Sequence, residues 1–274
     1  MVDDLDLEIL DLIDTKMNYN DVFKDWKLEN QRLILGPTCG ILKNKKQEER
    51  FVICGGKSPY GIDIYPASYS TCIVLESSTK QFCKSFDLLA DRAIISSVQL
   101  NENTLWVTGG CGRLGEIDWR TITEQKSTEF ISLDEPPVKG PDLPLTIIGH
   151  SMVKVDSKTI YIVGGKYMYN ENVFMKDTWI CDPTNNFKFK KGPCMNMARN
   201  QGISCAKMKI DNKNFLVAVH HEPNNPGYLP RYSVEEVPLH EKPIDSVELL
   251  DTSNPEKGWI IGMYGIIFLK CCLN

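Results

Sequence analysis

Histidine is scarce in this chain of 274 residues, which contains only four of them. None lies in a His-x-x-x-His pattern, and no Cys-x-x-Cys pair occurs. Such spacings supply the ligands of many metal sites. His220 and His221 head a long polar stretch and would need His240 as a third ligand, so they are interpreted as surface residues. We expect no metal site.

Strong basic charge and long apolar runs are also missing. The formal net charge is −5 and no basic stripe occurs, which argues against nucleic acid as a partner. The longest apolar stretch, Trp259 to Leu269, is too short to cross a bilayer. The acidic start, Met1 to Glu8, does not resemble a signal peptide, and no Asn-x-Ser/Thr site occurs. These absences favour a cytoplasmic protein without membrane contact, or a secreted one if the N-terminus is truncated.

Cysteine is plentiful, with ten residues, but the short-spaced framework of a disulfide-rich domain is absent. Many of the cysteines lie inside apolar strands, where a thiol packs as a small hydrophobic group. The adjacent Cys271 and Cys272 are expected to be two thiols, because a vicinal disulfide is strained and rare. A charge run from Lys43 to Arg50 precedes a strand and is interpreted as a solvated turn.

What the sequence does contain is an apolar strand that ends in paired glycines and recurs. The glycine pairs are Gly55-Gly56, Gly109-Gly110 and Gly164-Gly165, so the first glycines are 54 and 55 residues apart. One further step reaches Ala218-Val219, which we interpret as a fourth copy that has lost its glycines. A constant period of this size indicates one structural unit copied along the chain. Paired glycines permit positive φ and a close approach of the backbone to a neighbour.

Each unit contains further strands at matching distances from the glycine strand. Ser96, Ser151 and Cys205 begin strands thirteen residues before Gly109, Gly164 and Ala218, with a short polar turn between the two strands, as in a hairpin. A third strand ends in an acid each time: Glu76, Asp134, Asp182 and Asp251. A fourth strand carries an aromatic residue, except in the second unit. The fold class is therefore all-β, with the four-stranded antiparallel blades of a β-propeller.

At this point the chain resembles the kelch-repeat β-propeller family. The features that carry the likeness are the glycine pairs, the Asp182-Pro183-Thr184-Asn185 turn with the aromatic that follows it, and a Gly-Pro before the next unit. That last feature reads Gly140-Pro141 and Gly192-Pro193. The resemblance covers about residues 30 to 260.

The whole chain, residues 1–274, is predicted to be a single propeller domain. Its parts are a partial blade of outer strands at 1–30, blades at 31–90, 91–145 and 146–199, a degenerate blade at 200–262 and a terminal segment at 263–274. Leu7-Glu8-Ile9-Leu10-Asp11 copies Val247-Glu248-Leu249-Leu250-Asp251, which suggested the partial blade. The hypothesis is a five-bladed or incomplete ring, from a chain that is complete or a product of a longer parent.

A nucleotide-binding pattern, Gly110-Cys-Gly112-Arg-Leu-Gly115, follows the second glycine strand. Its first glycine belongs to the repeat and no helix is expected after it, so a bound phosphate would lack a helix N-terminus. We therefore expect no cofactor and no catalytic residue. The resemblance leaves one alternative open, because some kelch-fold proteins are copper oxidases and other propellers act on sugars.

Surface recognition remains, because repeat proteins place function in the loops at one face of a rigid scaffold. The loops after the glycine strands are rich in tyrosine, which provides contact area at little entropic cost. The predicted partner-binding residues are Tyr60, Tyr65, Arg113, Tyr167, Tyr169, Tyr228, Arg231 and Tyr232. The alternative is that these tyrosines pack between blades. Arg92 and Arg199 are expected to be structural and to bond backbone carbonyls between blades.

The resemblance therefore implies a non-catalytic module that binds a partner protein or peptide through loops on one face. Kelch propellers of this kind serve as adaptors, as substrate receptors of ubiquitin ligases or as cytoskeletal scaffolds. The BTB and BACK domains that usually accompany the ligase role have no room in this chain, so that role would need a longer parent.

Overall fold

A computed structural model describes residues 36–56, 69–113, 122–167, 173–199, 203–210, 212–219 and 246–263. Regular structure in these ranges is β-strand, apart from one short 3-10 turn at Pro255–Lys257. No helix in this part of the chain is long and apolar enough to cross a membrane. The all-β prediction is confirmed. The predicted partial blade at 1–30 and nearly all of the terminal segment lie outside the described residues.

The strands form four antiparallel sheets of four strands each. The first sheet has the order β1 (Thr38–Lys43), β2 (Glu49–Cys54), β3 (Tyr69–Glu76), β4 (Phe82–Arg92), and the second has β5 (Ser96–Asn101), β6 (Thr104–Thr108), β9 (Thr128–Ile131), β10 (Val138–Lys139). The third has the order β11 (Ser151–Asp156), β12 (Thr159–Val163), β15 (Thr178–Asp182), β16 (Lys188–Lys191), and the fourth has β17 (Ser204–Ile210), β18 (Lys213–Val219), β19 (Ser246–Asp251), β20 (Ile260–Met263). The predicted unit of four strands is therefore present four times.

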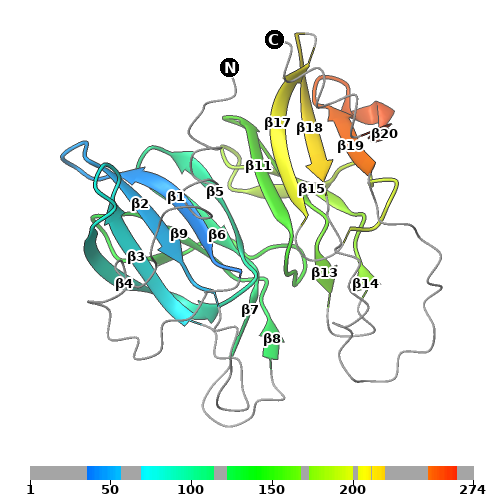
Figure 1. Cartoon of the computed structure of the whole chain (residues 1–274). Helices are drawn as coiled ribbons and strands as arrows, with labels where there is room; N and C mark the ends of the chain where they lie inside the picture. The colour runs from blue at the N-terminus through cyan, green and yellow to red at the C-terminus, as the bar shows by residue number, and fades with distance from the viewer. Residues whose placement is uncertain are drawn as a thin grey trace.

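Successive sheets meet at three junctions, and their first strands lie next to one another in the order β1, β5, β11, β17. Figure 1 shows the first two sheets on the left and the last two on the right. An apolar core fills each junction. Leu105 and Val107 of β6 belong to the core of the first junction, whereas Trp106 belongs to that of the second. Since neighbouring strand residues point to opposite faces, a sheet covered on both sides needs the unbroken apolar runs seen in the sequence.

A residue with positive φ precedes each of the first three sheets, and backbone hydrogen bonds join these three residues. Gly36 precedes the first sheet, Ile94 lies in the first linker (residues 92–95), and Gly149 lies in the second linker (residues 147–150). Their φ angles are 64°, 57° and 61°. The N–H of Ile94 donates to the Gly36 carbonyl at 2.8 Å, and the N–H of Gly149 donates to the Ile94 carbonyl at 3.0 Å. The linkers therefore form a continuous hydrogen-bonded chain across the sheets.

The register of the fourth sheet corrects one prediction. Ala218 is the Cα partner of Glu248, just as Val107 is the partner of Glu129 in the second sheet. Val107 lies two residues before the first glycine of its own pair, so Ala218 lies two residues before the corresponding position. The prediction that Ala218 and Val219 replace the glycines is therefore wrong, because both still belong to β18. The corresponding positions, 220 and 221, lie outside the described residues.

The second sheet also differs from the sequence expectation at its outer edge. Its third strand, β9, ends at Ile131 rather than at Asp134, and β10 is only two residues long. In the third and fourth sheets the predicted acid does end the strand. There Asp182 accepts from the N–H of Thr184 at 2.9 Å, and Asp251 accepts from the N–H of Ser253 at 2.9 Å. These side chains stabilise the turn to the outer strand.

Candidate functional site: the glycine-turn end

The three glycine pairs turn the chain at the same end of their sheets, and every glycine in them has a positive φ. The angles are 67° and 100° at Gly55-Gly56, 59° and 88° at Gly109-Gly110, and 60° and 98° at Gly164-Gly165. The second glycine of a pair docks on the linker to the next sheet. Gly56 donates its N–H to the Arg92 carbonyl at 2.7 Å, and Gly110 donates to the Ile147 carbonyl at 2.9 Å. The predicted positive φ and close backbone approach are both confirmed.

We expect Gly110→Ala to lower the free energy of unfolding by about 2–3 kcal/mol. A methyl group at Gly110 would lie 2.8 Å from the Ala93 carbonyl oxygen and would overlap the side chain of Ile95, in addition to the strain of positive φ. Gly258→Ala is the matched control, because Gly258 also has a positive φ, 77°, but has open space around the added methyl. Backbone strain alone should cost Gly258→Ala about 1–2 kcal/mol, less than Gly110→Ala, whose methyl also meets Ala93 and Ile95. Equal losses in urea titrations of the two variants would contradict the close-approach argument.

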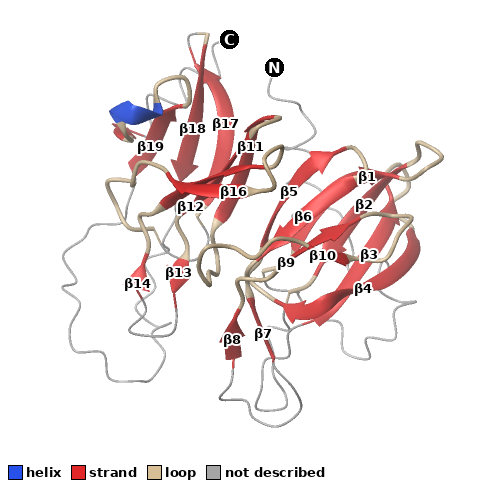
Figure 2. Ribbon diagram, turned by 180° about the vertical axis from the view of Figure 1, so that it is seen from behind, coloured by secondary structure: helices blue, strands red, loops and turns tan. Residues whose placement is uncertain are grey.

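Two short ribbons follow directly after the second and third glycine pairs. One consists of β7 (Cys111–Arg113) and β8 (Ile122–Glu124), the other of β13 (Lys166–Tyr167) and β14 (Val173–Phe174). Both project from the same end of the molecule, at the bottom of Figure 1, and Figure 2 shows the same from behind. Backbone bridges fix their bases, since Cys111 pairs with Ala93 and Lys166 pairs with Ile148. The linkers therefore position both ribbons.

Two of the predicted partner-binding residues lie in these ribbons. Arg113 is paired with Ile122 in the first ribbon, and Tyr167 is paired with Val173 in the second. The structure thus places their backbones at the same end of the molecule. The other six residues lie outside the described ranges: Tyr60, Tyr65, Tyr169, Tyr228, Arg231 and Tyr232.

A buried ion pair holds the first junction together beneath the glycine turn. Arg92, at the end of β4, donates from Nε to Oε1 of Glu129 at 2.8 Å, and both side chains are 1% exposed. Its Nη1 donates to the carbonyls of Gly109 and Ser127, each at 2.9 Å. The second oxygen of Glu129 accepts from the N–H of Leu89 at 2.6 Å. Arg92 therefore bonds backbone carbonyls across two sheets, which confirms its predicted structural role.

The third junction repeats this arrangement. Arg199, which follows the third sheet, lies 3.1 Å from Glu248 of β19, and neither side chain is exposed. Glu248 also accepts from the N–H groups of Asn196 at 2.7 Å and Met197 at 3.1 Å. A buried carboxylate is stable only when such donors replace water. Sequence reasoning missed both glutamates, although each is an acid inside an otherwise apolar strand.

The second junction has no such ion pair at the corresponding positions. Ile147 takes the place of Arg92, and Trp179 of β15 takes the place of Glu129, because its Cα partner Ile162 also lies two residues before a glycine pair. This junction is filled by an apolar core in which Trp106 packs edge-on against Phe187 with ring centroids 4.9 Å apart. Apolar contact therefore replaces the charge pairing of the other two junctions.

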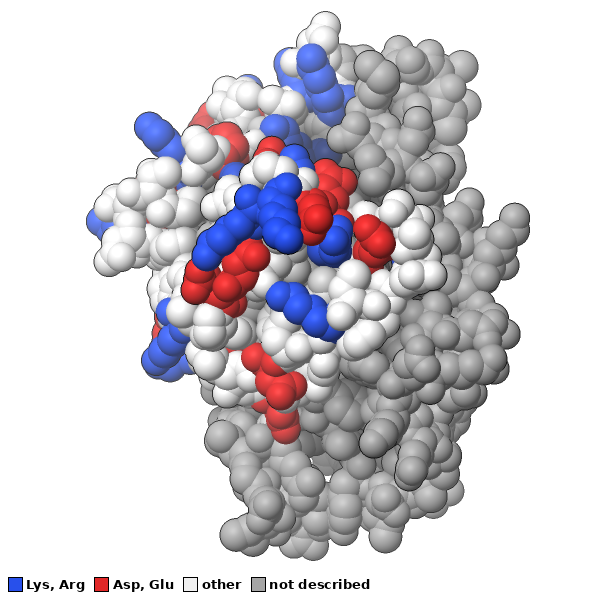
Figure 3. All heavy atoms as spheres, turned by 90° about the vertical axis from the view of Figure 1, so that its left-hand side faces the viewer, with Lys and Arg blue, Asp and Glu red and all other residues white. Residues whose placement is uncertain are grey.

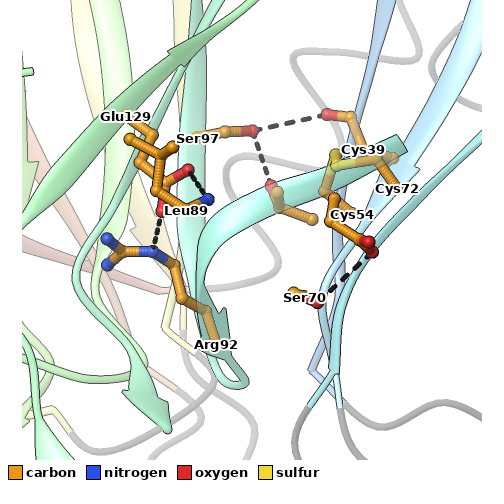
Figure 4. The surroundings of a disulfide bond; sticks show 10 residues. Cys39, Cys54, Ser70, Cys72, Leu89, Arg92, Ser97 and Glu129 are labelled. Carbon is orange, nitrogen blue, oxygen red and sulfur yellow. Dashed lines mark hydrogen bonds and ion pairs between the residues drawn. A yellow bond between two sulfur atoms is a disulfide. The ribbon is translucent and has the colours of Figure 1, made fainter. Parts of the chain in front are cut away.

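Cys54 and Cys72 form a disulfide at the base of the first glycine turn. They are directly opposed on β2 and β3, and their Cα atoms are 4.0 Å apart. Figure 4 shows the bond beside β1 and the Arg92–Glu129 pair nearby. Both cysteines are fully buried in the core of the first junction. The expectation that cysteines in apolar strands are thiols is wrong for this pair.

Other cysteines fit the expectation. Cys181 is buried on β15 as a thiol, where burial and then the charge of Asp182 raise its pKa to about 12. Burial similarly raises the pKa of the Cys205 thiol to about 12. Such groups stay protonated at neutral pH and are poor nucleophiles. Cys271 and Cys272 lie outside the described residues.

Metal and nucleotide sites can be tested in part. Within the described ranges, no group of three or more His, Cys, Asp or Glu residues could hold a metal ion. The candidate ligands His220, His221 and His240 lie outside those ranges. After Gly110 the chain forms β7 rather than a helix, as expected. Gly112 of the pattern therefore lies in a strand, and the first glycine, Gly110, serves the turn, whereas residues 114–121 lie outside the described ranges.

The described charges on the side of the molecule that lies left in Figure 1 are mixed in sign. Figure 3 shows acidic and basic side chains interspersed there. Lys45 in the β1–β2 turn pairs with Glu135 at 2.5 Å, and Arg50 pairs with Glu48 at 3.0 Å. The predicted solvated turn is confirmed, because Lys45 is largely exposed.

No protein-family model matches the chain, and no curated protein matches it.

Proposed function

We propose that the chain is a kelch-type β-propeller that binds a partner protein or peptide through the loops at its glycine-turn end. The single observation that carries this proposal is the repeated geometry of that end. Glycine pairs at equivalent positions dock on the linkers, and the ribbons that follow them project together. A rigid scaffold with several loops at one face is the arrangement that repeat proteins use for binding.

The stacking of the sheets supports the propeller. At each junction two successive sheets pack face to face, and a middle sheet uses one face for the junction before it and the other face for the junction after it. The outermost faces of the first and fourth sheets are apolar as well. On the first sheet Ile73 and Leu75 are each 3% exposed, and on the fourth Val217 is 5% and Val247 is 1% exposed. These side chains are therefore covered on the outer faces as well, as they would be in a closed ring, where each blade is packed on both faces.

The proposed function is binding by loop residues rather than catalysis. The loop residues predicted to bind are tyrosines and arginines, which dominate the energetics of protein interfaces. An adaptor or cytoskeletal scaffold in the cytoplasm is the role we propose. The binding site would take an extended or acidic segment of the partner, since arginine pairs with carboxylates in a planar, bidentate way.

We expect Tyr167→Ala combined with Tyr169→Ala to weaken partner binding at least tenfold, because truncating an interface tyrosine removes contact area at its centre. The melting temperature should change by no more than about 2 °C, since Tyr167 lies in the short β13–β14 ribbon, outside the four-stranded sheets and their cores. The partner is first isolated with the wild-type protein by affinity purification, and its Kd for each purified variant is then measured by calorimetry.

Two control variants separate binding from packing. Tyr167→Phe with Tyr169→Phe keeps the rings and should retain most of the affinity. Phe82→Ala removes a 40% exposed aromatic at the start of β4 and should leave the Kd unchanged. A fall of 8 °C or more in the melting temperature of the alanine variant, with an unchanged Kd, would show that the tyrosines are packing residues and would refute the proposal.

A further inference from the structure

The second linker, residues 147–150, connects the bases of both ribbons. The Ile147 carbonyl accepts from the N–H of Gly110, directly before the first ribbon, at 2.9 Å. Ile148 exchanges backbone hydrogen bonds with Lys166, where the second ribbon starts, at 2.9 and 3.1 Å. Detaching this linker would therefore release the two ribbons from each other.

The linker ends in His150, whose ring is enclosed at the second junction. The residue is 4% exposed, and its Nε2 lies 2.8 Å from Oγ1 of Thr108. That hydroxyl also lies 2.9 Å from Sδ of Met152 and 3.3 Å from the Ser96 carbonyl oxygen, so it can donate to either of them or to Nε2. Nε2 therefore has a hydrogen-bond partner in either tautomer of the neutral ring.

Nδ1 is buried and has no hydrogen-bond partner among the described residues. A charged ring carries a proton on both nitrogens, so the proton on Nδ1 would have no acceptor and the ring would place a charge in a dry site. In the first linker the corresponding position is occupied by Ile95, which lies against Gly55 as the His150 ring lies against Gly109. An apolar side chain therefore fits this position, and the imidazole is not required for packing.

The charged groups around the ring do not offset a positive charge on it. Arg92 donates to the carbonyl of Gly109, the residue that lies against the ring, and the charge of Arg92 is already paired with Glu129. Lys166 lies on β13, which pairs with the linker. No described carboxylate bonds to the ring. Burial accordingly lowers the pKa of His150 from 6.5 to about 3.

We propose that the second linker is an acid-sensitive latch, in which protonation of His150 detaches residues 147–150 from the glycine turns and uncouples the two ribbons. The buried, unpartnered Nδ1 makes the attached state incompatible with a charged ring. The first linker carries Ile95 at the corresponding position, and this side chain does not titrate, so the first linker should stay attached at pH values that open the second.

The direction of the effect follows from linkage. His150 has a lower pKa in the closed state than in the open state, where it approaches 6.5. Stability of the closed state is therefore complete above pH 6.5 and declines as the pH falls towards 3. The opening constant should rise about tenfold at pH 5.5 and about a hundredfold at pH 4.5.

Hydrogen exchange followed by mass spectrometry tests the latch on the full chain. Protection factors, corrected for the intrinsic pH dependence of exchange, are compared at pH 7.5, 5.5 and 4.5. We expect the hydrogen-bonded amides of Ile148, Gly149 and Gly110 to lose protection in acid by these factors, whereas those of Ala93 and Ile94 in the first linker retain theirs. In His150→Ile, which copies Ile95, the acid response of the second linker should disappear.

A second measurement keeps the test decisive if the variant does not fold. Two-dimensional NMR of the wild-type histidine rings reports the pKa of His150 directly, and a value below 5 is expected. A His150 that titrates near 6.5 in the folded protein would overturn the proposal. So would an equal loss of protection in both linkers, or an acid response that persists in His150→Ile.

Discussion

Arg92→Met should lower the free energy of unfolding by about 3–5 kcal/mol, the largest loss expected from any single substitution discussed above. The variant leaves the carboxylate of Glu129 buried at 1% exposure without its cation. It also removes the donors to the buried carbonyl of Gly109 and the half-buried carbonyl of Ser127. Urea-induced unfolding at pH 7 measures the change.

The double variant Arg92→Met/Glu129→Leu separates the unpaired charge from lost packing. It removes both charges and so imitates the second junction, where Ile147 and Trp179 occupy these positions. We expect it to recover at least half of the loss, because replacing a whole buried ion pair by apolar groups is often nearly neutral. A single variant within 1 kcal/mol of the wild type would contradict a stabilising role for the pair.

Removal of the Cys54–Cys72 bond is expected to lower the free energy of unfolding by about 3 kcal/mol. The bond joins residues 18 apart in sequence, and a loop of this length loses about that much conformational entropy in the unfolded state when it is closed. The test compares urea unfolding of the wild type with and without a dithiol reductant. In a reducing cytosol the reduced value applies, whereas an oxidising compartment preserves the bond.

A control variant for this test can be copied from the third sheet. Cys54→Val with Cys72→Thr copies the opposed pair Val163 and Thr178, which occupies the same place before a glycine turn. The variant should have the stability of the reduced wild type, and the reductant should not change it. A variant as stable as the oxidised protein would show that the covalent bond contributes nothing beyond packing.

The repeat unit could be predicted because it rests on local rules. Positive φ favours glycine wherever a strand turns against a neighbouring backbone, so the pair Gly109-Gly110 marks the turn in the sequence alone. The polar hairpin turns and the acid that ends a third strand, as at Asp182, are local in the same sense. The fourth sheet misled the prediction because a constant period was assumed. Its strand pairing shows that β18 extends past the expected glycine position.

The sequence by itself therefore determined an all-β chain of repeated four-stranded units with glycine turns at one end, since turn chemistry and periodicity act over a few residues. Only the tertiary structure decided which distant groups meet. Arg92 and Glu129 are 37 residues apart, and Arg199 and Glu248 are 49 apart. The pairing of Cys54 with Cys72 and the enclosure of His150 likewise depend on how the strands and sheets pack. Burial requires the charged side chains to form ion pairs and keeps the imidazole neutral, and the packing of strands sets which cysteines meet. Burial arises only when the sheets pack together, so the sequence pattern alone does not reveal it.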